Sequence, residues 1–401
     1  MKDLDLFQMA LGLDDKWIVS KSEFKPAEKR LDIYLDFAPG QQFPCPECQM
    51  DARVHDTEEK TWRHLNFFQH EAYLHARVPR IRCIEHGVKQ IAIPWARPHS
   101  GFSLLFEALI MSMADQMPVA AIAELVGETD KRLWRIIKHY VEQDLGRQDL
   151  SAVRRVGVDE TSTKRGHNYV SLFVDMDTGK VIFVTEGKDS TTLQAFKDHL
   201  VKHGGAAERI NDFSCDMSPA FITGIQEHFP AAHITFDRFH VMKLLNKALD
   251  EVRRQEQACE PMLKCSRYIW LKNKGNLSAK QEKKLSSLSL LNLKTARAYR
   301  MKLAFQTIFT YDGHLGIYEL KKWYSWAIRS RLEPIKVFAR TLKVHWDGIA
   351  RWFITKLTNG LLEGLNSLVQ AAKARARGYR STETFKLMIY MIAGDLGRLS
   401  T

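Results

Sequence analysis

Short apolar strands that end on an aspartate constrain the fold of this chain most strongly. Asp159, Asp216 and Asp237 each follow such a strand. The elements expected in this region are strands at 155–159, 168–175 and 180–185, a helix at 191–203, and, with a helix between them, strands at 210–215 and 233–236. This order predicts a mixed sheet covered by helices, the ribonuclease-H-like topology, with the first and fourth strands side by side.

Two of these aspartates are expected to converge in space. Asp159 and Asp216 are 57 residues apart, but they end strands predicted to be neighbours. Carboxylates held close together raise each other's pKa unless a cation compensates their charge. Hard divalent ions prefer oxygen ligands, and phosphoryl transfer on nucleic acids often uses two of them. We therefore expect a site for two Mg²⁺ or Mn²⁺ ions.

A third carboxylate normally completes such a site, and Glu363 is the best candidate. It lies on a predicted amphipathic helix with Asn366, three residues on and therefore on the same helix face. Gly360 and Gly364 flank Glu363 and are expected to let this helix approach the sheet closely.

The N-terminal region contains two residue pairs with the spacing of zinc ligands. The pairs are Cys45 with Cys48 and, after 34 intervening residues, Cys83 with His86. Each short loop lets two ligands converge on one tetrahedral ion, and the alternating pattern over 61–82 predicts a β-hairpin joining the loops. The alternatives are four unrelated residues, or competition from the intervening histidines His64, His70 and His75.

Residues 101–140 are predicted to form helices that include a helix-turn-helix. A small-residue helix ends near Gly127, and a second helix begins at a Thr or Asp cap. Leu133, Ile136 and Ile137 are then expected to face the core, and the side chains expected to face DNA are Lys131, Arg132 and Arg135. Any small helical hairpin is the competing interpretation.

The positive charge is regional. The chain has a net charge of +12, yet residues 1–240 sum to −6 and residues 241–401 to +18. Between Lys243 and Lys302 there are 15 basic and 5 acidic residues, more than solubility requires, although a solvated helix face is the simpler explanation. We expect this part to bind the phosphates of double-stranded DNA, through Lys283, Lys284, Arg297, Arg300, Lys373, Arg375 and Arg377.

The chain is expected to be cytoplasmic and not bound to a membrane. Its acidic start does not resemble a signal peptide, and its uncharged runs are shorter than the ~18 residues of a membrane-spanning helix. Six cysteines are too few for a disulfide framework, which favours metal ligation in a reducing compartment.

We expect a multidomain α/β protein. Its predicted parts are a zinc-binding β-hairpin domain at 1–95, a helix-turn-helix domain at 96–150, the first part of a ribonuclease-H-like core at 151–242, a basic all-α insertion at 243–355, and the C-terminal part of the core at 356–401.

Five motifs occur in an order that resembles one family. They are the segments 158–162, 215–220, 236–241, 359–366 and 377–379. Together they resemble bacterial insertion-sequence transposases of the ISL-three group, in which a zinc finger and a helix-turn-helix also precede the core. The resemblance covers about residues 40–395, and His86 stands where such fingers often have cysteine.

This resemblance implies a DDE transposase with Asp159, Asp216 and Glu363 as the metal-binding catalytic triad. Water would attack a phosphodiester at the element's end, and the freed 3′-hydroxyl would attack a second one. The partners implied are the element's terminal repeats, target DNA and at least one more copy of the chain. The alternatives are a metal-dependent nuclease that does not join strands and an inactive DNA-binding regulator.

Asp237 and His240 have two interpretations. Asp237 either caps the following helix while His240 packs at its start, which we favour, or it approaches the metal.

Overall fold

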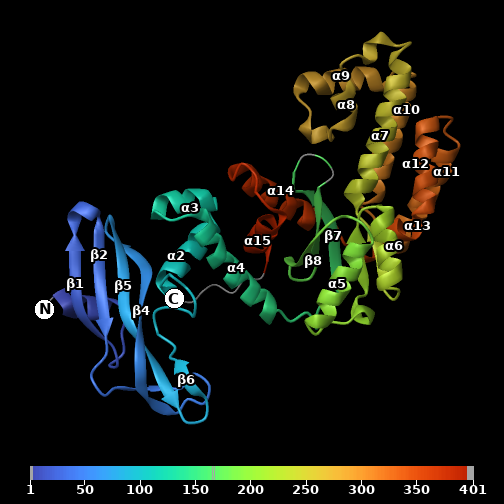
Figure 1. The fold of residues 1–401 in the computed structure, drawn as a ribbon. Helices are drawn as coiled ribbons and strands as arrows, with labels where there is room; N and C mark the ends of the chain where they lie inside the picture. Colours follow the sequence, from blue (N-terminus) through green and yellow to red (C-terminus); the bar gives the residue numbers. More distant parts are fainter. Residues whose placement is uncertain (1–2, 165, 167, 395–401) are drawn as a thin grey trace. The chain divides into compact units, whose positions relative to one another are not determined.

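The computed structural model describes residues 3–164, 166 and 168–394 (Figure 1). The described chain divides into two compact units, residues 3–142 and residues 143–394. In the described residues, no helix has the length and apolar character needed to cross a membrane.

The first unit contains a six-stranded sheet followed by helices. Its strands are β1 (Ile18–Lys25), β2 (Arg30–Asp36), β3 (Gln42–Pro44), β4 (Asp51–Phe67), β5 (His70–Cys83) and β6 (Gly87–Gln90). The sheet order is β1-β2-β5-β4-β3, and β6 pairs with β5. The helices are α1 (Asp3–Ala10), α2 (Leu104–Ala114), α3 (Val119–Val126) and α4 (Asp130–Arg147), with a 3₁₀ turn, η1, at Pro26–Glu28.

The predicted hairpin is present and longer than expected. β4 and β5 pair antiparallel, and their pairing runs from Val54 opposite Ile81 to Phe67 opposite His70. At its base β3 pairs with the start of β4 and β6 with the end of β5, so both ligand-bearing loops lie at the same end of the hairpin.

The predicted helix-turn-helix corresponds to α3 and α4. Gly127 ends α3 in the left-handed conformation with φ of 73°, which glycine adopts without steric cost. Leu133, Ile136 and Ile137 are fully buried, which confirms their expected place in the core. The buried Glu107 of α2 accepts a hydrogen bond from Tyr140 of α4 at 2.7 Å, and this contact ties the helices together.

The second unit is built on a five-stranded mixed sheet. Its strands are β7 (Arg155–Ser162), β8 (Tyr169–Asp175), β9 (Lys180–Glu186), β10 (Asp212–Cys215) and β11 (His233–Phe236). The order is β11-β10-β7-β8-β9, with β7, β8 and β9 antiparallel and β10 parallel to both β7 and β11. The expectation that the first and fourth strands are neighbours is confirmed. β7 does not end at Asp159, however, but continues to Ser162 through its pairing with β8.

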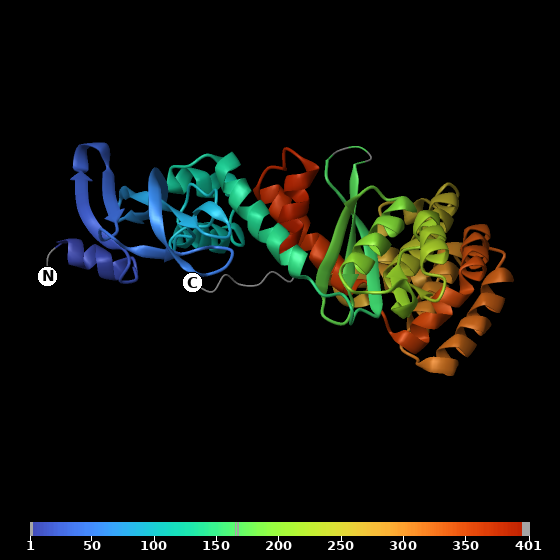
Figure 2. The ribbon, with the colours of Figure 1, turned by 60° about the horizontal axis from the view of Figure 1, so that its bottom comes forward.

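Helices cover both faces of this sheet (Figure 2). One face carries α5 (Thr191–Lys202) and α6 (Pro219–His228), where Phe196 stacks on Phe173 with ring centroids 4.4 Å apart. The other carries α14 (Gly360–Arg375) and α15 (Thr382–Ala393). Tyr390 of α15 accepts a hydrogen bond from the Val184 backbone N–H at 2.8 Å, which satisfies a donor of the edge strand β9.

The segment after β11 is helical, as expected. It comprises α7 (Arg238–Gln257), α8 (Arg267–Leu271), α9 (Ala279–Ser289), α10 (Lys294–Ile308), α11 (Gly313–Ile328), α12 (Glu333–Val344) and α13 (Trp346–Thr355), with 3₁₀ turns η3 at Pro261–Leu263 and η4 at Lys274–Asn276; a further turn, η2, precedes β10 at Ala207–Arg209. Lys302 is buried and its Nζ donates to the carbonyls of Trp270 and Leu271, so this member of the basic run stabilises the helices instead of facing solvent.

The glycine that lets α14 pack closely on the sheet is Gly157 of β7, and not Gly360 or Gly364 of the helix itself. A Cβ on Gly157 of β7 would come within 2.6 Å of Leu362, whereas one on Gly364 would have no neighbour within 4 Å and one on Gly360 only Thr358 at 3.6 Å. The expected role of Gly360 and Gly364 is therefore wrong. Those two glycines face away from the sheet, and Leu362 makes the contact.

Gly157→Ala is expected to destabilise the second unit by about 1 kcal/mol, the low end of the cost of overpacking, because the new methyl group displaces only the side-chain ends of Leu362 and Met176. The matched control, Gly364→Ala, should be neutral or add up to about 1 kcal/mol of helix stability. Urea unfolding of both variants measures the difference. An equal stability of the two proteins would contradict this packing.

Candidate active site and metal centre

The four predicted zinc ligands converge in the first unit. Their ligand atoms all lie within 4.8 Å of one another, and they form the one such group of three or more among the residues that the structure describes. Cys48 Sγ lies 3.6 Å from Cys83 Sγ, and His86 Nδ1 lies 3.6 Å from Cys83 Sγ and 3.8 Å from Cys45 Sγ. A zinc tetrahedron with bonds of ~2.3 Å to sulfur and ~2.0–2.1 Å to nitrogen has edges of about 3.5–3.8 Å. The residues therefore fit zinc.

Two further features favour metal ligation by this group. Hydrogen bonds from His86 lower the pKa of Cys83 to about 6, the backbone N–H having the larger effect and the side chain the smaller. The lower pKa favours the thiolate, which is the form that binds metal. The other ring nitrogen of His86, Nε2, lies 3.4 Å from the carboxylate of Glu47, which also pairs with Lys89 at 2.6 Å. A carboxylate at this position orients a metal-bound histidine.

The three intervening histidines are engaged elsewhere. His64 Nδ1 lies 2.7 Å from Ser103 Oγ, His75 Nε2 lies 2.7 Å from Asp32, and the ring of His70 packs edge-on against Phe24. None of them belongs to the ligand group.

In the second unit, three aspartates are level on adjacent parallel strands. Ser214 of β10 pairs with Gly157 of β7, and Cys215 pairs with Phe236 of β11. Extending this register by one or two residues places Asp216 beside Asp159 on one side and Asp237 on the other. Because side chains alternate along a strand, Asp159 lies on the same face as Gly157, the face that α14 covers.

Asp159 is held by the helix that carries Glu363. Asn366 Nδ2 donates to Asp159 Oδ2 at 2.8 Å, and one turn later Gln370 Nε2 donates to Thr161 Oγ1 at 2.7 Å. Burial raises the pKa of Asp159 to about 6, and the charge of Asp216 adds to this effect. The site therefore favours a proton or a cation on this carboxylate.

Glu363 lies one turn before Asn366 on the same face of α14. Its Oε1 and the Oδ1 of Asn366 are buried without a hydrogen-bond partner. Burial, with a smaller contribution from the charge of Asp237, raises the pKa of Glu363. Two buried acceptor oxygens without donors are the surroundings that a hard cation would satisfy.

Asp237 caps α7, as favoured from the sequence. One of its oxygens accepts from Phe239 N at 3.1 Å and the other from Asn359 N, also at 3.1 Å. Asn359 is itself buried, and its side chain accepts from Ser214 of β10. Asp237 therefore also fixes the start of α14, a role that the sequence did not indicate because Asn359 is 122 residues away.

His240 lies at the start of α7, where it contacts Asp237. Its Nδ1 is 3.5 Å from Asp237 Oδ2, and this contact, together with the charges of Asp216 and Asp159, raises its pKa. The same imidazole acts electrostatically on Glu363. His240 therefore interacts electrostatically with these carboxylates, and its ion pair is with Asp237.

The carboxylates are spread wider than a single-ion site. In the described residues, those of Asp159, Asp216 and Glu363 do not form a group with all ligand atoms within 4.8 Å. Two ions ~3.5–4 Å apart need a wider set of ligands than one ion does, and oxygen donors suit Mg²⁺ or Mn²⁺. The donor chemistry and the unpartnered oxygens fit such ions.

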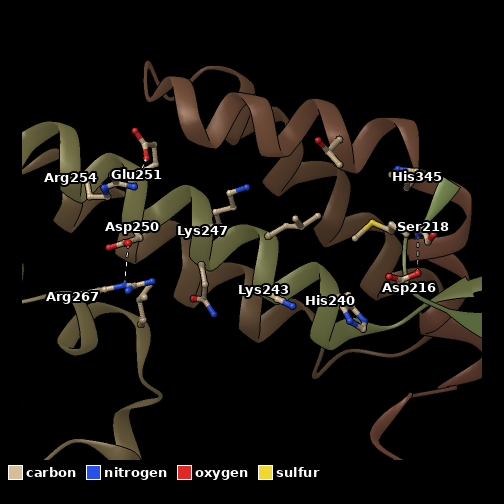
Figure 3. Close-up of a pocket in the computed structure, with 15 residues that line it drawn as sticks. Asp216, Ser218, His240, Lys243, Lys247, Asp250, Glu251, Arg254, Arg267 and His345 are labelled. Carbon is tan, nitrogen blue, oxygen red and sulfur yellow. Dashed lines mark hydrogen bonds and ion pairs between the residues drawn. The ribbon is translucent and has the colours of Figure 1, made fainter. Parts of the chain in front are cut away.

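A pocket of about 900 Å³, lined by both basic and acidic side chains, opens beside Asp216 and His240 along α7 (Figure 3). Arg254 and Arg267 in its wall pair with Glu251 and Asp250 at 3.6 and 3.1 Å. Lys243 and Lys247 also line it, and neither has an ion-pair partner within the described chain. These two lysines, which were not among the predicted DNA contacts, are the cations available to a phosphate here.

The predicted DNA contacts differ in their surroundings. Lys131, Arg135, Lys283, Lys284, Arg300, Arg375 and Arg377 are exposed. Arg132 instead pairs with Glu128 and lies over the ring of Phe102. Arg297 donates to the Ser330 carbonyl, and Lys373 donates to the Ser162 carbonyl at 2.8 Å. Arg297 and Lys373 therefore also hold the fold together.

Cys48→Ser is expected to remove zinc from the purified protein and to lower the melting temperature of the first unit, because the metal joins two loops that are 34 residues apart. Zinc content by mass spectrometry and thermal unfolding measure both effects. Cys259→Ser, at an exposed cysteine outside the ligand group, is the control. Retention of zinc by Cys48→Ser would contradict the ligand set.

Comparison with known proteins agrees with this arrangement. A transposase family model of the ISL3 group, for a DDE domain, matches residues 156–389. The helix-turn-helix domain of transposase family ISL3 matches residues 91–141, and the zinc-finger of transposase IS204/IS1001/IS1096/IS1165 matches residues 41–86.

Two curated relatives are similar over almost their whole length. The transposase for insertion sequence element IS1557 of Mycobacterium tuberculosis is 28% identical, over 98% of this chain and 96% of its own. The transposase for IS1001 of Bordetella parapertussis is 28% identical, over 90% and 91%. A solved structure of a simian T-cell lymphotropic virus intasome with a PP2A regulatory subunit aligns at 16% identity over 47% of this chain and 66% of its own, and its TM-score of 0.19 supports no conclusion. The chain is a member of the ISL3 family of DNA-binding transposases, with a zinc ribbon, a helix-turn-helix and a DDE domain.

Proposed function

We propose that this transposase cleaves DNA at the ends of its insertion sequence and joins the freed strand to target DNA, using a ribonuclease-H-like core. The observation that carries the proposal is geometric: the strand register places Asp216 beside Asp159, and the helix that carries Glu363 donates a hydrogen bond to Asp159 through Asn366, beside a pocket lined by Asp216 and Lys243. No side-chain nucleophile is required, because water and then the DNA 3′-hydroxyl can attack the phosphodiesters.

In this proposal Asp159, Asp216 and Glu363 hold two divalent cations, Mg²⁺ or Mn²⁺. When bound, such ions activate the attacking oxygen and stabilise the leaving one. Asn366 keeps the Asp159 carboxylate oriented through its 2.8 Å hydrogen bond. Asp237 positions the start of α14 through Asn359, and so sets where Glu363 stands relative to the strands.

His240 supplies a positive charge next to the reacting phosphate. Its contact with Asp237 raises its pKa, which keeps the ring protonated to a higher pH than a free histidine. Lys243 and Lys247 extend this positive surface along α7. Together these groups would bind the DNA backbone on either side of the reacting phosphate.

The remaining DNA contacts follow the division of charge. Exposed Lys131 and Arg135 on α4 would reach the element's terminal repeat, and Arg132 would need to leave Glu128 to do so. The exposed basic residues on the insertion and after α14 would bind backbone phosphates, with Lys283, Lys284 and Arg300 as the main contacts. Bringing two element ends together requires at least a dimer.

Glu363→Gln is expected to lower DNA cleavage by more than about 100-fold, because even partners that only support a metal ligand contribute ~10–100-fold. The assay uses labelled duplexes from the DNA that flanks the gene, with Mg²⁺ or Mn²⁺. Glu383→Gln, at an exposed glutamate of α15, is the matched control and should keep full activity.

The products separate the alternatives. Cleavage that survives Glu363→Gln would overturn the site assignment. Cleaved but never joined product from the wild type would identify a nuclease, and specific binding without cleavage would identify a regulator.

A further inference from the structure

A second pocket, of about 680 Å³, also lies along α7, and most of its lining residues differ from those of the first pocket. Glu363 and Gly360 at the start of α14 form one wall, and residues from α7, α10 and the segment after α8 form the others. Lys243 and Asn246 line both this pocket and the one beside Asp216. Because Glu363 lines it, the inference drawn from this pocket rests on the proposed function.

An exposed aromatic ring stands in this pocket. Phe239 is 55% exposed although Asp237, two residues before it, is fully buried. Its neighbour Arg238, also in the lining, lies over the rings of Phe309 and Trp352, and Phe309 lines the pocket too. A large apolar ring left in solvent next to a catalytic carboxylate offers a flat face for stacking.

Amide side chains line the same pocket as this ring. Asn246, Asn273, Asn276 and Gln306 all line the pocket. The Oδ1 of Asn246 is buried and has no hydrogen-bond partner, while Gln306 Nε2 donates to Asn273 Oδ1 at 3.1 Å. Amides present a donor and an acceptor side by side, the pattern that matches the edge of a nucleobase.

We propose that this second pocket receives one nucleobase that leaves the DNA duplex next to the phosphodiester at Glu363. Phe239 stacks on the base, Asn246 and Asn273 hydrogen-bond its edge, and Lys243 and Lys272 bind the adjoining phosphates. The pocket's volume of about 680 Å³ lies within the range of ligand pockets, roughly 300–1,000 Å³. Removing a base from the stack costs a few kcal/mol, which stacking on an aromatic side chain offsets.

The test uses duplexes from the DNA flanking the gene, with 2-aminopurine placed in turn at each position around the cleavage site. Ca²⁺ replaces Mg²⁺ so that binding is observed without cleavage. Wild-type protein should raise the fluorescence at one position, because the probe is no longer stacked between bases. Phe239→Ala should abolish this signal, Phe239→Tyr should keep it, and Tyr318→Ala, at an exposed ring on α11, should leave it unchanged.

Cleavage in Mg²⁺ supplies the second measurement. Phe239→Ala should cleave paired DNA at least about 5-fold more slowly. A mismatch at the identified position should restore the rate to within about 2-fold, since the base then leaves the stack at little cost. A variant that is only misfolded would not be rescued by a change in the DNA.

Failure of this inference and failure of the proposed function give different results. No fluorescence change at any position, or no rescue by the mismatch while wild type cleaves, would overturn the base pocket alone. Fluorescence that depends on Phe239 without any cleavage in Mg²⁺ or Mn²⁺ would support the pocket and overturn the proposed chemistry.

Discussion

Three aspartates lie side by side at the carboxyl ends of neighbouring parallel strands, and the repulsion between their charges is the main constraint on the second unit. The register of β7, β10 and β11 places Asp159, Asp216 and Asp237 side by side, and burial raises the pKa of Asp159 to about 6. Carboxylates on neighbouring strands repel one another in a partly buried site unless cations or hydrogen-bond donors compensate their charge. The remaining contacts of the site compensate these negative charges.

The charge of each aspartate is compensated in a different way. The negative charge of Asp237 is stabilised within the protein. His240 lowers its pKa in spite of burial, and two backbone N–H groups donate hydrogen bonds to its oxygens. Asp159 accepts one hydrogen bond on each oxygen, from the Glu160 backbone N–H and from Asn366, whereas Asp216 accepts one from the Ser218 backbone N–H and lines an open pocket. Asp237 therefore serves as a fixed structural anion that anchors α14, and the two less satisfied aspartates are left for external cations.

Much of this arrangement was predictable because it is local in the sequence. The ends of β10 and β11, the zinc-ligand spacing and the apolar face of α4 each follow from short patterns. The first half of β4 was missed because residues 51–60 are mostly charged and gain their strand conformation from pairing with β5; β1 and β2 were not among the predicted elements. The hydrogen bond from Asn366 to Asp159 and the docking of Leu362 on Gly157 depend on contacts between distant segments, which no single-sequence pattern encodes.

The central claim is that Asp159, Asp216 and Glu363 share two divalent ions. Electron paramagnetic resonance of Mn²⁺ added to the protein–DNA complex tests it most directly, with Asp216→Asn and the distant surface variant Asp198→Asn compared with wild type. We predict spin coupling between two manganese ions ~3.5–4 Å apart in wild type and Asp198→Asn, and its loss in Asp216→Asn. Coupling that persists in Asp216→Asn, or wild-type complex that binds no manganese, would contradict the claim.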